Sequence, residues 1–450
     1  MADLSRIVKA YDIRGVVPEE FDFTTARALG SAFARYVSSD AIVVGRDMRP
    51  SGPEFVDAFA EGAQDVGVNL IDLGLVSTDL LYFASGRLDL PGAVFTASHN
   101  PAQYNGIKFC QAGARPVGID SGLADIRDAA QAMLDGDVPE VAAERGQREQ
   151  RDMLDAFVDH VMSFVDVSAL KPMRVVADTA NGMGGLVVPA LFERLPMIEL
   201  EVMYGELDGT FPNHPADPLQ PANQRDLQAR VVSGGFDLGL AFDGDADRVF
   251  IVDEKGVGLS GSMTTAILAV AMLRNYPGST ILHNLICSKA VPETISAHGG
   301  NPVRTRVGHS YIKTEMASRN AVFGGEHSAH YYFADNFNAD SGLIASLIMI
   351  SELARSGSTL SEMRRPYEPY VASGEINTVV DDPSAVIDRV RDAYSQCDLD
   401  ELDGLTVDAG EWWFNLRPSN TEPLLRLNLE AADVASCDAQ VAEVLDIITA

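Results

Sequence analysis

The chain has 450 residues, of which 46% are hydrophobic and 22% charged, and its formal net charge is −31 at pH 7. This length predicts about three domains, with cores large enough to fold without disulfides or structural metals. The negative charge argues against nucleic acid and anionic membranes as partners, because both require a basic surface. A phosphorylated substrate would also be repelled, so its binding requires basic residues gathered at the site.

No segment of the sequence indicates export or membrane insertion. The N-terminal residues lack an apolar signal core, and no apolar run approaches the length of a membrane span. The four cysteines are far apart and form no CxxC pair, which is typical of reduced thiols. We therefore expect a cytoplasmic protein.

The N-terminal third alternates β-branched runs with amphipathic stretches. Residues 41–45 and 93–96 are predicted to be buried strands, and residues 53–66 between them a helix. This alternation is typical of βαβ units. Residues 121–150 are polar and predicted to be helical, and a domain boundary is expected at 147–150.

Two further α/β patterns follow, and the C-terminal tail has a different character. The second pattern begins at residues 174–178, and the third extends from about 257 to 365, before a Pro-containing linker at 365–369. Further predicted elements are strands at 238–242, 406–407, 412–416 and 424–429, and helices at 262–274, at 342–354 and from about 434. The tail therefore predicts an α+β domain with an antiparallel sheet.

Three aspartates stand at every second position in Asp243-Gly244-Asp245-Ala246-Asp247. Their carboxylates converge on one hard cation only if the backbone curls, which Gly244 permits. Oxygen ligands favour Mg²⁺, which keeps other positions for water or a phosphoryl oxygen. An acidic surface loop and a Ca²⁺ loop are the alternatives. Strand-like flanks and the lack of a glycine at the sixth position argue against an EF-hand.

Ser98 follows the predicted strand at 93–96 and precedes Asn100-Pro101, so it lies on a turn at the carboxyl end of a strand. Folds of the α/β class place active groups there. A serine hydroxyl in this position can attack or hold a phosphoryl group that a metal polarises. An ordinary turn is the alternative. A Ser-His-Asp hydrolase is disfavoured, because no Gly-x-Ser-x-Gly elbow surrounds the serine.

Two other loops have polar side chains suited to a sugar phosphate. Glu326, Ser328 and His330 alternate after a predicted strand at 321–323, so in an extended loop they would share one face and bind sugar hydroxyls. The segment 417–423 joins an arginine to three small polar residues, a composition that suits a phosphate dianion. Each segment, taken alone, is also consistent with an ordinary loop.

Motifs of two other classes of phosphate enzyme are missing or altered. No Gly-x-x-x-x-Gly-Lys-[Ser/Thr] sequence occurs, which argues against a P-loop kinase. The segment Glu206-Leu207-Asp208-Gly209-Thr210 nearly matches the Asp-x-Asp-Gly-Thr motif of haloacid-dehalogenase-type phosphatases. Glu206, however, replaces the nucleophilic aspartate, so we discount this class.

Taken together and in this order, the motifs resemble those of the α-D-phosphohexomutase superfamily, and most closely its bacterial phosphomannomutase/phosphoglucomutase branch. The likeness covers the whole chain, through residues 11–15, 96–101, 243–248, 325–330 and 417–421. It implies an α/β fold of three related α/β domains with mixed sheets and a C-terminal α+β domain with an antiparallel sheet, arranged around a central cleft. The expected domains are 1–150 with the phosphoserine loop, 151–255 with the metal loop, 256–366 with the sugar loop and 367–450 with the phosphate loop.

The resemblance also implies roles for individual residues. Ser98 would be the phosphoserine and, with Asp243, Asp245 and Asp247, would hold Mg²⁺. The residues implied for catalysis are Ser98, His99, Lys108, Arg248, His309 and His330. Those implied for substrate binding are Tyr11, Arg14, Lys289, Gly308, His309, Glu326, Ser328, His330, Arg417, Ser419, Asn420, Thr421 and Arg426. The basic members would supply the local positive charge that binding requires.

The implied reaction interconverts mannose 6-phosphate and mannose 1-phosphate, and the corresponding glucose phosphates. Phospho-Ser98 donates its phosphoryl group to the free hydroxyl, which gives a hexose 1,6-bisphosphate that is also the activator, and then takes back the other phosphate. Lys108 would transfer the proton, provided that neighbouring cations lower its pKa, and His309 and His330 are the rivals. We expect a monomer or small homo-oligomer that binds hexose phosphates.

The alternatives are a phosphoglucosamine mutase or phosphoglucomutase of the same family, a metal-dependent sugar phosphatase and a non-catalytic carbohydrate sensor. A two-metal phosphatase would need a cluster with histidine ligands, whereas one three-aspartate loop is apparent. A sensor would have no use for Ser98 beside the aspartates. Many family members have glycine at the positions of Ala97 and Ala329, and these departures bear on substrate preference and not on the type of reaction.

Overall fold

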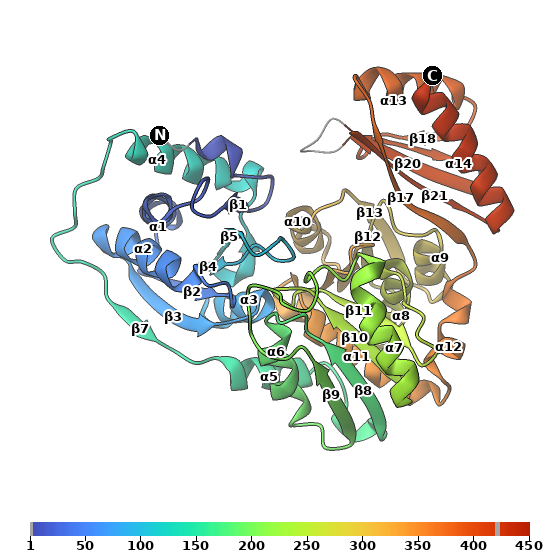
Figure 1. Ribbon diagram of the computed structural model, residues 1–450, viewed down its shortest axis with the longest axis horizontal. Helices are drawn as coiled ribbons and strands as arrows, with labels where there is room; N and C mark the ends of the chain where they lie inside the picture. The colour runs from blue at the N-terminus through green and yellow to red at the C-terminus, as the bar shows by residue number, and fades with distance from the viewer. Residues whose placement is uncertain (1–2, 419–423) are drawn as a thin grey trace.

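The computed structural model describes residues 3–418 and 424–450, with every side chain in these ranges except that of His309. The described residues form four β-sheets, which follow one another along the chain from blue to red in Figure 1. The three N-terminal sheets are mixed, and the C-terminal sheet is antiparallel, so the predicted fold class is confirmed.

The N-terminal sheet has the strand order β1-β5-β4-β2-β3-β7, with β6 paired to β5. Its strands are β1 (Ile13–Val16), β2 (Ala41–Arg46), β3 (Asn69–Leu75), β4 (Gly92–Phe95), β5 (Tyr104–Gln111), β6 (Arg115–Pro116) and β7 (Arg148–Gln150). Its helices are α1 (Phe23–Val37), α2 (Gly52–Asp65), α3 (Thr78–Leu88) and α4 (Leu123–Leu134). Residues of α1, α2 and α4 share one core, whereas α3 packs into the core of the following domains. The predicted elements at 41–45, 53–66 and 93–96 are confirmed as β2, α2 and β4.

The predicted helix over 121–150 is wrong beyond residue 134. Gly136, just after α4, has a φ of 111°, in the left-handed region that favours glycine and ends helices. The backbone N–H groups of Ala142 and Gly146 then donate hydrogen bonds to carbonyl groups of α2. The segment therefore follows α2 back to the sheet, where β7 pairs in parallel with β3.

The second sheet has the order β11-β10-β8-β9, and the third has the order β13-β12-β14-β15-β16. Their strands are β8 (Met173–Asp178), β9 (Ile198–Met203), β10 (Leu238–Phe242), β11 (Val249–Asp253), β12 (Thr280–Asn284), β13 (Asn301–Thr305), β14 (Phe323–Gly325), β15 (Tyr331–Phe333) and β16 (Ala339–Asp340). Their helices are α5 (Leu154–Met162), α6 (Gly184–Phe192), α7 (Arg225–Gly234), α8 (Gly261–Asn275), α9 (Ala290–Ala297), α10 (His309–Arg319), α11 (Gly342–Ser356) and α12 (Leu360–Met363). One continuous hydrophobic core joins both sheets to α3.

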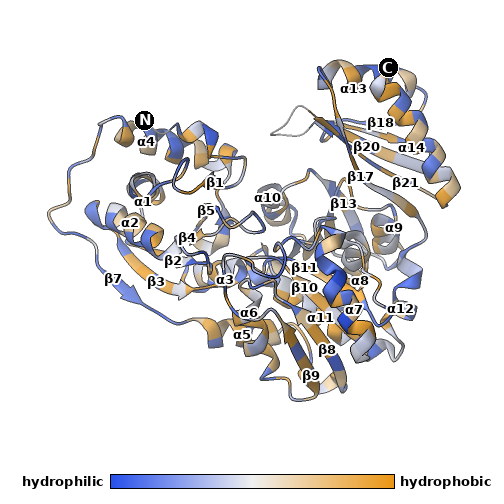
Figure 2. Ribbon diagram, viewed as in Figure 1, coloured by the Kyte–Doolittle hydropathy of each residue, from blue (hydrophilic) through white to orange (hydrophobic). Residues whose placement is uncertain are grey.

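Helix α11 lies in this shared core, where Figure 2 shows it and β8 with mostly hydrophobic colouring. Among the described residues, no single helix is long and apolar enough to cross a membrane. One bent pair, α11 with residues 360–367, satisfies the length and composition required, but most residues of α11 are buried inside the protein.

The C-terminal domain is an antiparallel sheet in the order β17-β21-β20-β19-β18, with its own hydrophobic core. Its elements are β17 (Val371–Val379), α13 (Pro383–Ala393), β18 (Asp398–Asp400), β19 (Leu405–Asp408), β20 (Trp412–Pro418), β21 (Leu424–Ala431) and α14 (Val434–Thr449). The sequence predicted β19, β20, β21 and α14 but not β17, β18 or α13. The two missed strands lie at the edges of the sheet and are largely exposed, so neither has the apolar run that marks a buried strand.

Candidate active site

Ser98 lies in the turn after β4, with a left-handed backbone φ of 48°. This conformation is uncommon for a residue other than glycine and is typical of functional sites. The side chain is buried, and its hydroxyl donates a hydrogen bond of 2.9 Å to Asp243 Oδ2. The guanidinium of Arg248 lies 3.4 Å from the same hydroxyl. The serine of the first domain thus contacts the acidic loop of the second.

The aspartate loop joins β10 to β11, and its three carboxylates are at most 1% exposed. One oxygen atom from each carboxylate lies within 4.8 Å of the others. The backbone curl depends on Ala246, with a φ of 63°, and Gly244 is not among the residues with a positive φ. Gly244 is needed for a different reason, because a Cβ there would lie 2.4 Å from the carbonyl oxygen of Ser98.

The carboxylate oxygens fit a bound divalent cation. Asp245 Oδ1 and Asp247 Oδ1 are buried and accept no hydrogen bond from the described residues. Leaving such oxygens without partners is costly, and a hard cation that takes oxygen ligands would satisfy them. Burial raises the pKa of Asp243 well above its usual range. The pKa of Asp245 lies well below its usual range instead. Burial raises this pKa, but the charge of Lys108 and the hydrogen bonds that the carboxylate accepts, from Lys108 and Thr78 among others, together outweigh burial.

Lys108 lies on β5 and points at this loop. Its Nζ is 2.7 Å from Asp245 Oδ2 and 2.6 Å from Asp247 Oδ2. Burial lowers the pKa of the ammonium group, but the two carboxylates outweigh this effect and raise the pKa well above its ordinary value. The expectation that neighbouring cations lower the pKa of Lys108 is therefore wrong, because its direct partners are acidic.

The described histidines of the site are held in their neutral form. His99 Nδ1 lies 3.3 Å from Ser98 Oγ and 2.6 Å from Arg248 Nη2, and burial lowers its pKa well below the usual value. Burial also lowers the pKa of His330, whose Nε2 lies 3.7 Å from Asp247 Oδ1. His309 is the first residue of α10, and its side chain lies outside the described part of the chain.

The predicted sugar loop is a tight turn between β14 and β15, not an extended segment. The N–H of Ala329 donates to the carbonyl of Glu326 at 3.0 Å, and the N–H of Glu326 donates to the carbonyl of His330 at 3.0 Å. Ala329 has a φ of 66°, which closes the turn. Ser328 Oγ lies 3.0 Å from His330 Nδ1, so these two side chains still meet on one side.

Glu326 is buried and held by three donors from the same domain. Its Oε1 accepts hydrogen bonds of 3.1 Å from Asn284 Nδ2 and from the N–H of Gly308. Its Oε2 accepts one of 2.7 Å from the hydroxyl of Tyr332. Gly308 has a φ of 132°, and a Cβ there would lie 2.5 Å from the hydroxyl of Tyr11, so this position requires glycine.

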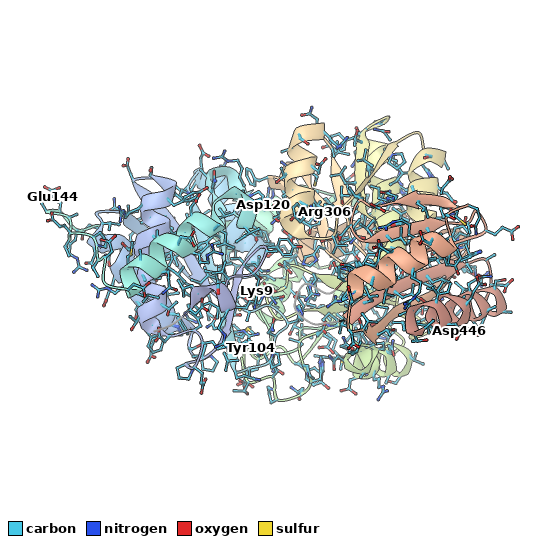
Figure 3. All side chains as sticks on the ribbon, turned by 90° about the horizontal axis from the view of Figure 1, so that it is seen from above. Lys9, Tyr104, Asp120, Glu144, Arg306 and Asp446 are labelled. Atoms are coloured by element: carbon cyan, nitrogen blue, oxygen red, sulfur yellow. The ribbon has the colours of Figure 1, made fainter. Side chains whose placement is uncertain are left out.

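A cavity of about 680 Å³ connects these groups. The predicted site residues that line it are Tyr11, Arg14, Ser98, His99, Lys108, Arg248, Gly308, Glu326, Ser328 and His330. They come from three domains, and the lining also includes Arg6, Lys9 and Tyr104. Figure 3 shows Lys9 and Tyr104 on the side of the N-terminal domain that borders the other domains. The basic lining residues meet the expectation of local positive charge in an acidic chain.

Three other predicted binding residues lie outside this lining. Lys289 Nζ pairs with Asp408 Oδ1 at 2.6 Å. Arg417 and Arg426 are opposite each other on β20 and β21, and they approach the carboxylate of Glu375 at 3.1 Å and 3.6 Å. Ser419, Asn420 and Thr421 lie outside the described residues. The described part of the chain thus brings the first three domains together at Ser98.

Two residues that support the site were not found from the sequence. The hydroxyl of Thr78, at the start of α3, donates a 2.7 Å hydrogen bond to Asp245 Oδ2. Nothing in the sequence distinguishes this threonine from an ordinary residue at a helix start. Arg49 is completely buried beneath the turn that contains Ser98. The sequence did contain a signal for Arg49, because Asp47 and Arg49 follow the central parallel strand β2 at its carboxyl end, where such folds place active groups.

Known proteins resemble the chain over its full length. Family models of phosphoglucomutase/phosphomannomutase match alpha/beta/alpha domain I at residues 5–133, domain II at 155–256, domain III at 260–370 and the C-terminal domain at 375–447. A phosphomannomutase of Salmonella montevideo is 39% identical over 450 residues, with 98% of each chain covered. Phosphohexose mutases of Xanthomonas campestris pv. campestris are 40% identical over 446 residues, again with 98% of each chain covered.

Among solved structures, a phosphoglucomutase/phosphomannomutase family protein from Burkholderia thailandensis matches with a TM-score of 0.90 at 30% identity, covering 100% of this chain and 97% of that one. Fold, site and relatives together define an isomerase of the phosphohexomutase class. The chain belongs to the phosphoglucomutase/phosphomannomutase family. Its four domains are confirmed, and the expected boundaries between them stay predictions.

Proposed function

We propose that the chain is a phosphomannomutase that reversibly interconverts mannose 6-phosphate and mannose 1-phosphate, and also accepts the glucose phosphates. The observation that carries the proposal is the 2.9 Å hydrogen bond from Ser98 to Asp243, because it places a strained serine against three carboxylates suited to a cation. The relatives named phosphomannomutase support mannose as the sugar.

In the proposed reaction Ser98 carries the phosphoryl group at rest. The bond between phosphorus and Ser98 Oγ breaks as a bond forms to the free hydroxyl of the bound hexose phosphate, which gives a hexose 1,6-bisphosphate. After this intermediate has reversed its orientation in the site, Ser98 Oγ takes the other phosphoryl group and the isomeric hexose phosphate leaves. An intermediate that escapes from the site leaves Ser98 without a phosphoryl group. Catalytic amounts of the bisphosphate therefore activate the enzyme, because they restore phosphoserine. Such transfers depend chiefly on positioning and on stabilising spread negative charge.

The aspartate loop would hold Mg²⁺ together with the Ser98 phosphate, through Asp243, Asp245 and Asp247. Mg²⁺ bound there would polarise phosphoryl oxygens as a Lewis acid. Arg248 contacts both Ser98 and Asp243, so its fixed positive charge lies where the phosphoryl group is transferred. Charged donors of this kind are stronger than neutral ones, particularly in a buried site.

Proton transfer is divided between two residues in this proposal. Lys108 stays protonated, because its carboxylate partners raise its pKa, and it acts as a proton donor and as a positive charge. His330 is neutral near pH 7, because burial lowers its pKa, and we assign it as the acceptor of the sugar hydroxyl proton. Glu326 and Ser328 would bind the sugar hydroxyls from the same turn.

A coupled assay with three sugar 1-phosphates tests the proposal. Mannose 1-phosphate, glucose 1-phosphate and glucosamine 1-phosphate are supplied with Mg²⁺ and catalytic glucose 1,6-bisphosphate. We expect the highest kcat/KM for mannose 1-phosphate, a lower value for glucose 1-phosphate and the lowest for glucosamine 1-phosphate. A preference for glucosamine 1-phosphate would establish the phosphoglucosamine mutase instead, and net release of inorganic phosphate would establish the phosphatase.

A further inference from the structure

The guanidinium of Arg49 is buried beneath the turn that contains Ser98. Its Nη2 donates hydrogen bonds to the carbonyl oxygens of Ser98 at 3.0 Å and of Asn100 at 2.6 Å. Its Nη1 donates to the carbonyl oxygens of Pro101 and Tyr104, both at 2.8 Å. One side chain therefore holds three carbonyl groups of the turn between β4 and β5 and a fourth on Tyr104, the first residue of β5.

The remaining donor of Arg49 is paired within its own loop. Its Nε lies 3.2 Å from Asp47 Oδ2, and both side chains are completely buried. Asp47 Oδ1 also accepts the backbone N–H of Arg49 at 2.9 Å. An arginine without solvent is tolerated only when its charge is paired and its donors are used, and this one meets both conditions.

The second domain covers the other side of Arg49. The ring of Phe211 lies 5.3 Å from the guanidinium carbon, within the range of a cation–π contact. A Cβ at Gly209 would lie 2.6 Å from the Cα of Arg49, so this glycine allows the two backbones to meet. Both residues belong to the segment 206–211, which has the near-match to a phosphatase motif and no part in the proposed chemistry.

This segment is itself rigid. Asp208 Oδ1 accepts the backbone N–H of Thr210 at 2.9 Å and the Thr210 hydroxyl at 2.7 Å. The backbone N–H of Asp208 donates to the carbonyl oxygen of Asn181 at 3.0 Å, which fixes the turn to the second domain. The aspartate of the near-motif therefore forms a turn and is not placed as a nucleophile.

We propose that Arg49 is the positioning residue of Ser98: it keeps the serine in its left-handed conformation, and Gly209 and Phe211 keep Arg49 in place. The inference rests on the proposed role of Ser98. The carbonyl groups of Ser98 and of three residues after it point at one guanidinium, which fixes the backbone from the serine onward, so the hydroxyl stays directed at Asp243. Without this clamp the strained turn relaxes, and the phosphoryl group is no longer aligned for transfer.

The variant Arg49→Lys tests whether Arg49 positions Ser98 for phosphoryl transfer. Lysine keeps the charge but lacks the planar fork that reaches several carbonyl groups at once. We expect kcat to fall at least about tenfold, since small misplacements are costly in phosphoryl transfer. The KM values for mannose 1-phosphate and for Mg²⁺ should stay within about twofold, because Arg49 contacts neither the sugar loop nor the carboxylate ligands.

Two further variants complete the experiment. Phe211→Leu removes the ring over the guanidinium and should lower kcat by a smaller factor, about two- to fivefold, again with unchanged KM. Arg174→Lys is the matched control, since Arg174 also lies over a phenylalanine, Phe236 at 4.6 Å, but on the surface. It should leave kcat unchanged. Intact mass after mixing with glucose 1,6-bisphosphate measures the rate of Ser98 phosphorylation, which should be slower in Arg49→Lys.

Each result decides the inference. It is overturned if folded Arg49→Lys keeps kcat within twofold, or if kcat, both KM values and thermal stability change together. If Arg49→Lys does not fold, Phe211→Leu decides, and an unchanged kcat overturns the inference. Ser98→Ala separates it from the proposed function: activity that persists in Ser98→Ala contradicts the role of Ser98 itself. Loss of activity there, with full activity in Arg49→Lys, contradicts the clamp alone.

Discussion

Thr78 of the first domain holds Asp245 of the second by two hydrogen bonds. The threonine hydroxyl donates to Asp245 Oδ2 at 2.7 Å, and the Thr78 N–H donates to the Asp245 carbonyl oxygen at 3.1 Å. A carboxylate that is to bind a metal is thus oriented by the start of α3, in another domain. Mutation of such partners of metal ligands typically lowers metal affinity or activity by about 10- to 100-fold.

We therefore expect Thr78→Val to weaken binding of Mg²⁺ by about tenfold. The valine keeps the shape of the side chain and the backbone hydrogen bond but removes the hydroxyl. Activity measured against Mg²⁺ concentration should show the loss as a raised half-saturation value, and Thr78→Ser, which keeps the hydroxyl, should restore it. An unchanged Mg²⁺ dependence in Thr78→Val would contradict this role.

Lys108 should remain charged throughout the physiological range, because its carboxylate partners outweigh burial and raise its pKa. No loss of kcat between pH 7 and about 9 should come from this residue. Lys108→Met should lower kcat by a factor of about 10²–10⁴, the usual contribution of a proton-transfer group. The pH–rate profiles of both proteins, at saturating Mg²⁺ and bisphosphate, provide the measurement. Near-normal turnover in Lys108→Met would exclude the proposed role.

Glu326 should be sensitive to loss of its charge, because three donors converge on its carboxylate. In Glu326→Gln one oxygen becomes an NH₂ group that faces a donor, either from Asn284 and Gly308 or from Tyr332. Hydrogen bonds to charged groups are worth about 1.5–3 kcal/mol, so kcat/KM should fall by about 10- to 100-fold. Tyr332→Phe removes a single donor and should have the smaller effect. Steady-state kinetics in which both variants match the wild type would show that Glu326 does not bind the sugar.

Asp79 gives the protein a pH-dependent stability. Burial raises its pKa from 3.8 to about 7, although hydrogen bonds from Ser341 and Ser77 oppose the shift. Between about pH 4 and pH 7 the folded protein therefore binds a proton that the unfolded chain releases, so the stability from this carboxyl is fully present only below about pH 4 and is lost progressively as pH rises to about 7.

Asp79→Asn has no proton to lose, so it should raise Tm relative to the wild type by several degrees at pH 8 and by clearly less at pH 5, where the carboxyl has lost only part of its contribution. One kcal/mol is worth about 2–4 °C in a chain of about 150–250 residues and less in a longer chain. Asp137→Asn, which alters an exposed carboxyl, is the control and should have no effect at either pH. An equal shift of Tm at both pH values would contradict the account of Asp79.

The sequence predicted those parts of the site whose residues lie close together in the chain. Ser98, the three aspartates and the turn from Glu326 to His330 each combine reactive groups within a few residues, next to a recognisable strand. Their chemistry could be inferred locally, although the role of Gly244 and the shape of the sugar turn could not. A positive φ at Ala246 or Ala329 has no signature in residue type.

What the sequence could not predict depends on contacts between distant segments. Arg49 is 49 residues from Ser98, and Thr78 is 167 residues from Asp245. The partners of Lys108 decide its pKa, and the basic residues that the family resemblance implies in the cleft suggested the wrong sign. The edge strands β17 and β18 were missed for a related reason, because an exposed strand lacks the apolar run on which the prediction depends.

The central claim is that Ser98 carries the phosphoryl group, and its most direct test is transfer from glucose 1,6-bisphosphate labelled with ³²P. The wild-type chain, mixed with the labelled compound and Mg²⁺, should acquire acid-stable label that maps to the peptide containing Ser98, and chasing with mannose 1-phosphate should remove it. Ser98→Ala should acquire no label and show no mutase activity. Label elsewhere in the chain, or undiminished activity in Ser98→Ala, would contradict the account.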